Sequence, residues 1–349
     1  MTTFPLSGIL FGAKASGSTT QSSKRIRAMA ASSISSTSVA LVALMKLKGV
    51  GRRGALRIVH GPIPDNDAKD LIVDRAMRAR ISESAFLDAW DRAWDELEST
   101  EAKETKFFSF YDEGYPERLR NIPDPPAVLY VKGDVAGLHA TKCLAVVGTR
   151  EPTAYGEVVA RKSASTAVGE GFTIVSGLAH GCDTFGHEGC LDAHGIGVAV
   201  MAHGLDKVYP AANRGLASRL LENGGCLVSE YPLGVTPMRT AFAERDRIQS
   251  GLSDAVLVVE TDVKGGTMHT VRFCREQKRL LACIDHPDKW KDEDKTKGNQ
   301  MMIAQRWAHG ICDGVALTQF LTHIEQVETL PEDGSETRNN SDPQTRMSF

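Results

Sequence analysis

The sequence predicts an α/β protein built on a doubly wound, mostly parallel sheet, with a small all-helical domain before it. A chain of 349 residues is long enough for two domains. From residue 143 on, short apolar runs alternate with helix-length segments, a pattern typical of parallel strands joined by helices. Residues 38–59 instead have the pattern of a helix, a tight turn and a second helix.

Composition limits the class of protein. Hydrophobic residues make up 42% of the chain, which is enough for a packed core. No run of 18 uncharged apolar residues occurs, so the sequence predicts no membrane-spanning helix. The seven cysteines are odd in number and form no C-x-x-C pair. We therefore expect reduced thiols and a cytoplasmic protein.

Both ends of the chain are predicted to be disordered tails. Residues 1–36 form a basic tail rich in Ser, Thr, Ala and Gly, while residues 326–349 form an acidic tail without periodicity. The apolar stretch FPLSGILFG is too short for a secretory signal. The composition is also compatible with a transit peptide, and Met29 is an alternative translation start.

Residues 37–105 are predicted to form the helical domain. The glycines between its first two helices and the arginines after them resemble a helix-hairpin-helix, in which backbone N–H groups face a phosphate. The candidate secondary DNA contacts are Gly49, Gly51, Arg52 and Arg53. An ordinary two-helix corner is the alternative. Residues 66–103 continue as an amphipathic helix, in which Trp90 and Trp94 are expected to pack in the core.

Residues 106–325 are predicted to form the sheet domain. Its first part, 107–133, is Pro-rich and irregular and ends in a short strand at 128–131. Further strands are expected at 143–148, 172–176, 197–203, 226–229, 254–260 and 280–284, with helices near 155–168, 183–193, 213–222, 240–251, 267–278 and 299–308. In such a sheet, ligands bind at the carboxyl ends of the strands.

Glycines and polar residues follow five of these strands. Glycine lets a backbone approach a phosphodiester closely, and basic side chains neutralise it. Arg150, Lys207 and Arg239 would make this edge of the sheet positive. The other candidates here are Gly148, Thr149, Ser176, Gly177, Asp183, Gly204, Tyr209, Asn213, Gly265, Gly266, Thr267 and Thr270. Arg245 and Arg247 fall within one helical turn and either bind phosphate or form a structural ion pair.

The ordered motifs VVGTREPTAYG, FTIVSGLAHGCDTFGHEGCL, GLDKVYPAANRGL, GGCLVSEYPLG, FAERDRIQSGLSDAVLVVE and KGGTMHT resemble the DprA/Smf family of DNA-processing proteins. The resemblance covers roughly 107–320 and implies an extended Rossmann-like domain that binds single-stranded DNA without a cofactor. It also implies a non-catalytic homodimer that protects incoming strands during natural transformation and hands them to the RecA recombinase.

The resemblance assigns roles to individual positions. Arg150 would contact phosphate, and Arg239, three residues before Phe242, would be the basic residue of the pocket. Asp183 and His187 match the Asp and His of the second motif. Lys207 aligns more loosely. Many members carry a C-terminal winged helix, which is not expected here.

Two departures from the family pattern alter the site's charge and polarity. Asp246 replaces an asparagine, and His269 stands where an apolar residue is usual. They leave open a divergent subgroup that serves a mobile element or a defence system. A sensor of a free nucleotide or nucleotide-derived signal is a further alternative, because the same loops could hold a single nucleotide.

A catalytic site and a metal site have less support in the sequence. A nucleoside-monophosphate phosphoribohydrolase would need a catalytic carboxylate where Arg272 stands. A zinc site could use Asp183, His187, Cys190 and His194, which share one face of a predicted helix. The family motif implies no metal at Asp183 and His187, so no metal is expected.

Overall fold

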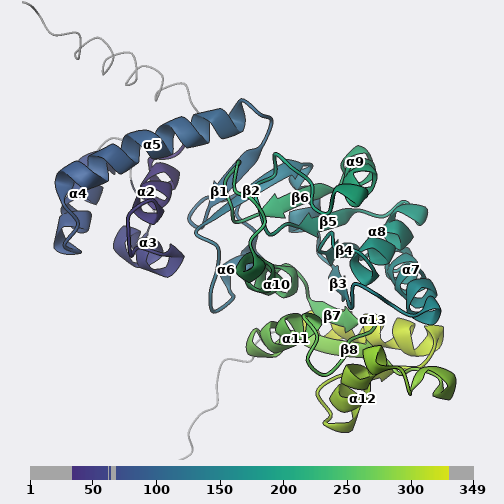
Figure 1. The fold of residues 1–349 in the computed structure, drawn as a ribbon. Helices are drawn as coiled ribbons and strands as arrows, with labels where there is room; N and C mark the ends of the chain where they lie inside the picture. Colours follow the sequence, from purple (N-terminus) through teal and green to yellow (C-terminus); the bar gives the residue numbers. More distant parts are fainter. Residues whose placement is uncertain (1–33, 62, 64–67, 330–349) are drawn as a thin grey trace, which may run out of the picture. The chain divides into compact units, whose positions relative to one another are not determined.

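The computed structural model describes residues 34–61, 63 and 68–329 (Figure 1). The chain divides into two compact units, one ending at Lys103 and the other beginning at Glu104. The expectations for a transit peptide, a start at Met29, a basic tail before residue 34 and an acidic tail beyond residue 329 lie outside the described residues. Ser36, which the sequence assigned to the basic tail, instead begins a helix. Within these residues, no helix is long and apolar enough to cross a membrane.

The smaller unit contains four helices in its described part. They are α2 (Ser36–Met45), α3 (Arg52–Val59), α4 (Ala68–Arg78) and α5 (Glu83–Glu101). The helix predicted over 66–103 is in fact α4 and α5. It breaks where Arg80 has a φ of 64°, and Ser82 then caps α5 by accepting a hydrogen bond from the Ala85 amide. Trp90 and Trp94 are buried, as expected from their spacing.

The larger unit is built on a nine-stranded sheet among the described residues, in the order β1-β2-β6-β5-β4-β3-β7-β8-β9. Strands β3 to β9 pair in parallel, whereas β1 and β2 add an antiparallel edge. The bounds are β1 (Lys106–Ser109), β2 (Val128–Gly133), β3 (Cys143–Val147), β4 (Thr173–Ser176), β5 (Gly197–Val200), β6 (Cys226–Ser229), β7 (Ala255–Val258), β8 (Leu280–Ile284) and β9 (His309–Ile311).

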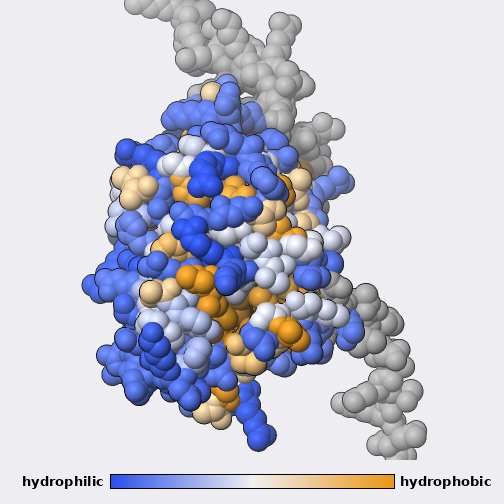
Figure 2. All heavy atoms as spheres, turned by 90° about the vertical axis from the view of Figure 1, so that its right-hand side faces the viewer, coloured by the Kyte–Doolittle hydropathy of each residue, from blue (hydrophilic) through white to orange (hydrophobic). Residues whose placement is uncertain are grey.

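Helices cover both faces of the sheet, which confirms the doubly wound α/β fold (Figure 1). One face carries α7 (Ala154–Gly169), α8 (Cys182–Asp192), α9 (Arg214–Glu222) and α13 (Gly314–Thr329). The other carries α6 (Glu117–Arg120), α10 (Arg239–Gly251), α11 (Thr267–Glu276) and α12 (Lys297–Ala304). Figure 2 shows the face with α7, α8 and α13 as mostly hydrophilic, with apolar side chains near its middle.

The strands are added toward one edge of the sheet from β3 to β6, and toward the other edge from β7 onward. From β3 the strands proceed through β4 and β5 to β6, and β7 then starts on the other side of β3, where Leu144 pairs with Ala255. The loops after β3 and β7 therefore leave a topological switch point, where doubly wound sheets form a crevice. These loops carry Gly148–Arg150 and Gly265–Thr267.

Some elements differ from the sequence predictions. β1 and β9 were not expected, because β1 lies in the Pro-rich connector and β9 has only three residues. The strands expected at 197–203 and 254–260 end earlier, at Val200 and Val258, and the residues after them belong to the loops of the site. Helix α13 includes residues 326–329, which the sequence assigned to the acidic tail.

Candidate nucleic-acid interface

The loop after β3 is held in place by backbone hydrogen bonds from two neighbouring segments. The Thr149 amide donates to the Glu260 carbonyl at 2.7 Å, and the Cys182 amide donates to the Thr149 carbonyl at 3.1 Å. Gly181 makes the second bond possible. Its φ is +79°, and a Cβ there would lie 2.4 Å from the Thr149 carbonyl oxygen. The loop is thereby fixed while the Arg150 side chain stays exposed.

A groove of about 810 Å³ lies along this loop, between α10 and the start of α11. The N-terminal ends of α8 and α11 both border it, and helix N-termini favour anions. The predicted residues that line it are Gly148, Thr149, Arg150, Asp183, Tyr209, Arg239, Phe242, Arg245, Gly265, Gly266, Thr267 and Thr270. The structure thus brings together residues from the loops after β3, β4, β5 and β7 with residues of α10 and α11.

Two exposed arginines supply positive charge to the groove. The Arg150 guanidinium lies 5.3 Å from the centre of the Phe242 ring, a cation–π contact that orients it. Arg239 occupies the first position of α10, whose first turn contains no acidic residue. Because a cation at a helix N-terminus opposes the helix dipole, Arg239 does not stabilise α10 and is suited to binding an anion.

Arg245 forms part of the groove wall, but carboxylates hold its guanidinium. Its Nη2 lies 3.5 Å from Asp183 Oδ2, its Nε lies 3.2 Å from Asp246 Oδ1, and its Nη1 donates to the Val200 carbonyl at 3.3 Å. Gly177 makes room for it, because a Cβ at that position would lie 2.0 Å from Nη1. Arg245 therefore positions two buried acids and is less available to a phosphate than the exposed arginines.

Burial raises the pKa values of both acids. The pKa of Asp183 rises, although the nearby Arg245 charge opposes the rise. The pKa of Asp246 rises to about 7, with burial as the largest cause and the Asp183 charge adding to it, while Arg245 and Arg150 oppose it. Asp246 consequently gains or loses a negative charge near neutral pH, on the wall of the groove.

We predict that this proton controls the affinity of the groove for polyanions. Asp246 is mostly protonated at pH 6 and mostly ionised at pH 8, so the affinity of the protein for an oligonucleotide should fall as the pH rises through about 7. Asp246→Asn should remove this part of the pH dependence and bind more tightly than the wild type at pH 8. Fluorescence anisotropy at constant ionic strength measures both effects. An equal pH dependence in the two proteins would contradict the assignment.

Several predicted residues support the loops from behind the groove. The Ser176 hydroxyl donates to the Val146 carbonyl at 2.7 Å, and the Gly177 carbonyl lies 2.7 Å from His187 Nε2. Asn213 is buried and donates to the Leu178 and Ala179 carbonyls and to Thr184 Oγ1. Direct DNA contact by Ser176, Gly177, His187 and Asn213 therefore receives no support from their positions.

Three further candidates lie elsewhere. Gly204 packs against the backbone after β6, because a Cβ there would lie 2.4 Å from the Pro232 carbonyl oxygen. Lys207 is exposed but lines a separate hollow beside α9. Arg247 is buried and pairs with both carboxylate oxygens of Glu230 at 2.6 Å, so the structural ion pair is correct and phosphate contact is not supported.

The candidates of the smaller unit keep the status of a prediction. Gly49 has a φ of +85°, and a Cβ at Gly49 or Gly51 would meet no atom within 4 Å. This open space would let a phosphate approach the turn before α3. Arg52 and Arg53 begin α3. No described contact tests whether these four residues bind DNA.

The zinc alternative receives no support from the geometry. Asp183 pairs with Arg245, His187 Nε2 is bonded to a carbonyl, and His194 lies beyond the end of α8. Over the part of the chain that the structure describes, no three His, Cys, Asp or Glu residues are grouped so as to hold a metal ion.

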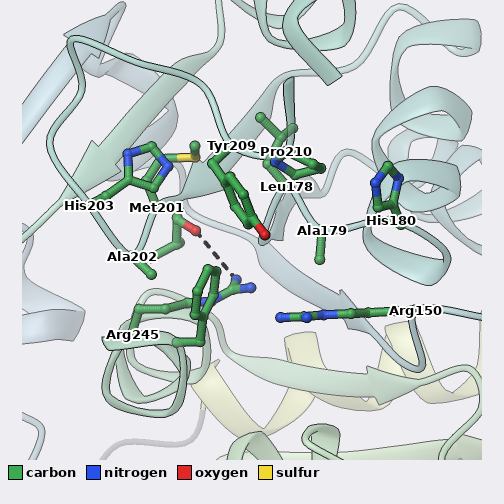
Figure 3. Close-up of a pocket in the computed structure, with 12 residues that line it drawn as sticks. Arg150, Leu178, Ala179, His180, Met201, Ala202, His203, Tyr209, Pro210 and Arg245 are labelled. Carbon is green, nitrogen blue, oxygen red and sulfur yellow. Dashed lines mark hydrogen bonds between the residues drawn. The ribbon is translucent and has the colours of Figure 1, made fainter. Parts of the chain in front are cut away.

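Sequence reasoning missed a smaller cavity of about 70 Å³ that adjoins the groove (Figure 3). The two share Arg150, Ala179, Tyr209, Phe242 and Arg245. The missed residues that line the cavity are Leu178, His180, Val200, Met201, Ala202 and His203. Gln249 and Asp262 in the groove were also missed. Only their location at strand ends or on α10 could have indicated them.

Comparison with known proteins identifies the family to which this chain is similar. The family described as DNA recombination-mediator protein A matches residues 106–322. The chain is 42% identical to protein Smf of Escherichia coli over 175 residues, which is 50% of this chain and 46% of that protein. It thus spans about half the length of the first curated relatives.

Two solved structures resemble this one in fold. The first is DNA processing protein A from Streptococcus pneumoniae, with a TM-score of 0.63 and 27% identity over 81% of this chain and 95% of that chain. The second is DNA processing protein A from Helicobacter pylori, whose structure gives insights into a unique single-stranded DNA binding mode. Its TM-score is 0.56, with 25% identity over 64% of this chain and 97% of that chain. The resemblance inferred from the motifs is confirmed, and this chain belongs to the DNA recombination-mediator protein A family, DprA/Smf.

Proposed function

We propose that the groove at the β3/β7 switch point binds single-stranded DNA through its phosphates. The observation that carries the proposal is the placement of exposed Arg150 and Arg239 on a groove bordered by two helix N-termini. Neither arginine has a carboxylate within ion-pair distance in the described part of the chain. Such a site attracts a polyanion with little regard to base sequence.

The strand would occupy the whole groove, and more than one of its phosphodiesters would contact the protein. Arg150 would neutralise one phosphate, and Arg239 with the α11 N-terminus would neutralise others. A groove of about 810 Å³ exceeds what a single phosphate group requires but is also the size of a small-ligand pocket. Its two exposed arginines are the reason for proposing a polymer, and a mononucleotide signal remains the alternative outcome of the test.

Membership of the family extends the proposal to a biological role. We propose that the protein protects single strands during DNA uptake and passes them to a RecA-type recombinase, and that it acts as a homodimer. A mediator of this kind needs no catalytic group. Consistent with that, exposed Arg272 pairs with Glu276 on α11 at 3.6 Å, where a phosphoribohydrolase would present a carboxylate.

A binding titration tests the proposal. Single-stranded oligonucleotides should bind, duplex DNA of the same length should bind more weakly, and a nucleoside monophosphate at a concentration near that of the strand should not compete. Fluorescence anisotropy with a labelled strand measures all three results. Displacement of the strand by a mononucleotide at similar concentration would favour the sensor alternative.

A further inference from the structure

Helix α11 and the residues beside it carry a dense set of positive charges that leads away from the groove. Residues 264–279 contain five Lys and Arg and one acid, in a chain whose net charge is −3. The first turn of α11 lines the groove through Thr267, His269 and Thr270. The helix also packs against α10, which forms another wall of the groove (Figure 1). The basic segment is therefore continuous with the candidate binding site.

Four exposed side chains form a row along this segment, which we call the α11 row. They are His269, Arg272, Arg275 and Lys278. They follow one another in steps of three residues, which is the spacing of an oblique row on a helix surface. His269 belongs to the lining of the groove, and the helix rises about 9 Å from there to Arg275. Lys278 follows just after the end of the helix.

Aromatic rings hold two of these cations in place. The Arg272 guanidinium lies 4.7 Å from the centre of the Phe273 ring, and the Arg275 guanidinium lies 4.1 Å from the centre of the Trp307 ring. A side chain that is already oriented loses less conformational freedom when it binds a ligand. Both arginines remain exposed, so an external phosphate can reach them.

Acidic side chains neutralise little of this charge. Glu276 pairs with Arg272 at 3.6 Å, but the two side chains are 53% and 58% exposed, and an ion pair at the surface is weak. Arg275 and Lys278 have no carboxylate within ion-pair distance in the described part of the chain. The α11 row is thus available to an anion from outside the protein.

We propose that the α11 row continues the path of a bound single strand beyond the groove, with Arg272, Arg275 and Lys278 each contacting a phosphate. The inference rests on the proposed function, because the strand must first occupy the groove. Nucleic acid fits the row because a strand repeats its negative charge along its length, as the row repeats its positive charge. Cations beside aromatic rings are also the combination that binds single strands without regard to base sequence.

The test compares two oligo-dT strands, one of about 5 and one of about 15 nucleotides, which span the lengths that single-strand-binding domains cover. The variant Arg272→Gln/Arg275→Gln/Lys278→Gln removes three charges and introduces good helix formers. It should bind the long strand about tenfold more weakly than the wild type, as expected for three exposed contacts. Its affinity for the short strand, which fills only the groove, should be unchanged. Fluorescence anisotropy measures both affinities.

The salt dependence of the wild type gives a second measurement that needs no variant. The slope of log affinity against log salt should be larger in magnitude for the long strand than for the short strand by about 2, or about 0.7 for each of the three phosphates. The matched control, Lys106→Gln/Lys162→Gln/Arg219→Gln, removes three exposed charges outside the groove and the row. It should bind both strands as the wild type does.

Unchanged binding of the long strand by the folded α11 variant would overturn the proposal, and so would an equal decrease for both strands. If the wild type binds the two strands with equal affinity and equal salt slopes, the binding site ends at the groove. The proposed function then stands, and only the α11 row is wrong. If the wild type binds neither strand, both are wrong.

Discussion

Reversing the charge of both exposed arginines, with Arg150→Glu and Arg239→Glu, should abolish binding of an oligo-dT strand in a gel shift. Each substitution replaces an attraction to phosphate by a repulsion, in a groove whose other charged side chains are largely acids. Neutral replacement of a single arginine should be milder. It should lower the magnitude of the salt slope of log affinity by about 0.7 for each phosphate that the protein no longer neutralises.

The matched control reverses two exposed charges outside the groove. Lys162→Glu on α7 and Arg219→Glu on α9 change the net charge by the same amount. This control should bind with nearly the wild-type affinity, because neither side chain lines the groove and salt screens exposed charges that make no direct contact with the strand. Normal binding by a folded Arg150→Glu/Arg239→Glu protein, or an equally large decrease in the control, would contradict the assignment of the groove.

Arg247→Ala should destabilise the fold by about 3–5 kcal/mol, the usual consequence of removing one partner of a buried ion pair. The Arg247 side chain is only 1% exposed and holds Glu230 by two hydrogen bonds of 2.6 Å. It also donates to the Asp124 carbonyl at 2.8 Å. Its removal would leave the largely buried Glu230 side chain, which is 9% exposed, without its main partner. Urea denaturation measures the change in free energy of unfolding.

A double variant distinguishes the effect of losing the Arg247–Glu230 ion pair from the effect of losing a phosphate contact at Arg247. Arg247→Met with Glu230→Leu removes both charges and should be less destabilising than Arg247→Ala alone, because no charge is left unpaired. The folded fraction of either variant should keep its affinity for oligo-dT. A decrease in affinity without a decrease in stability in Arg247→Ala would instead favour a phosphate contact at this position.

The contrast between Arg247 and Arg150 illustrates how far the sequence can lead. Both are arginines in motifs of the resemblance, but only Arg150 lies on a strand-end loop at the switch point. The alternation of strands and helices predicts a parallel sheet, so the place of that loop at the carboxyl ends of the strands was predictable, whereas the strand order and the switch point came from the structure. The partner of Arg247 was not, since Glu230 lies on a different segment and only the folded backbone brings the two together.

Residues that act through backbone contacts were the hardest to assign. Asn213 and Ser176 have side chains suited to phosphate, yet each donates to a carbonyl inside the fold. Gly177 was a candidate for close approach to DNA, but the close neighbour is the Arg245 guanidinium. A sequence gives the donor type and its place near a strand end, but not which acceptor the donor reaches.

The small cavity beside the groove could not be predicted for a similar reason. Met201 and His203 line it, but their positions depend on the folded loop after β5. The sequence indicated only that this loop follows a strand and carries polar residues, which is enough to locate the edge of the sheet but not its chemistry.

The most direct test of strand binding measures affinity for oligo-dT of increasing length, at several salt concentrations, with thymidine monophosphate as competitor. A strand-binding groove predicts affinity that rises with length until the site is filled, a log affinity that falls linearly with log salt, and no competition by the mononucleotide at concentrations near that of the strand. Affinity that is independent of length, with the mononucleotide saturating the site, would contradict the account.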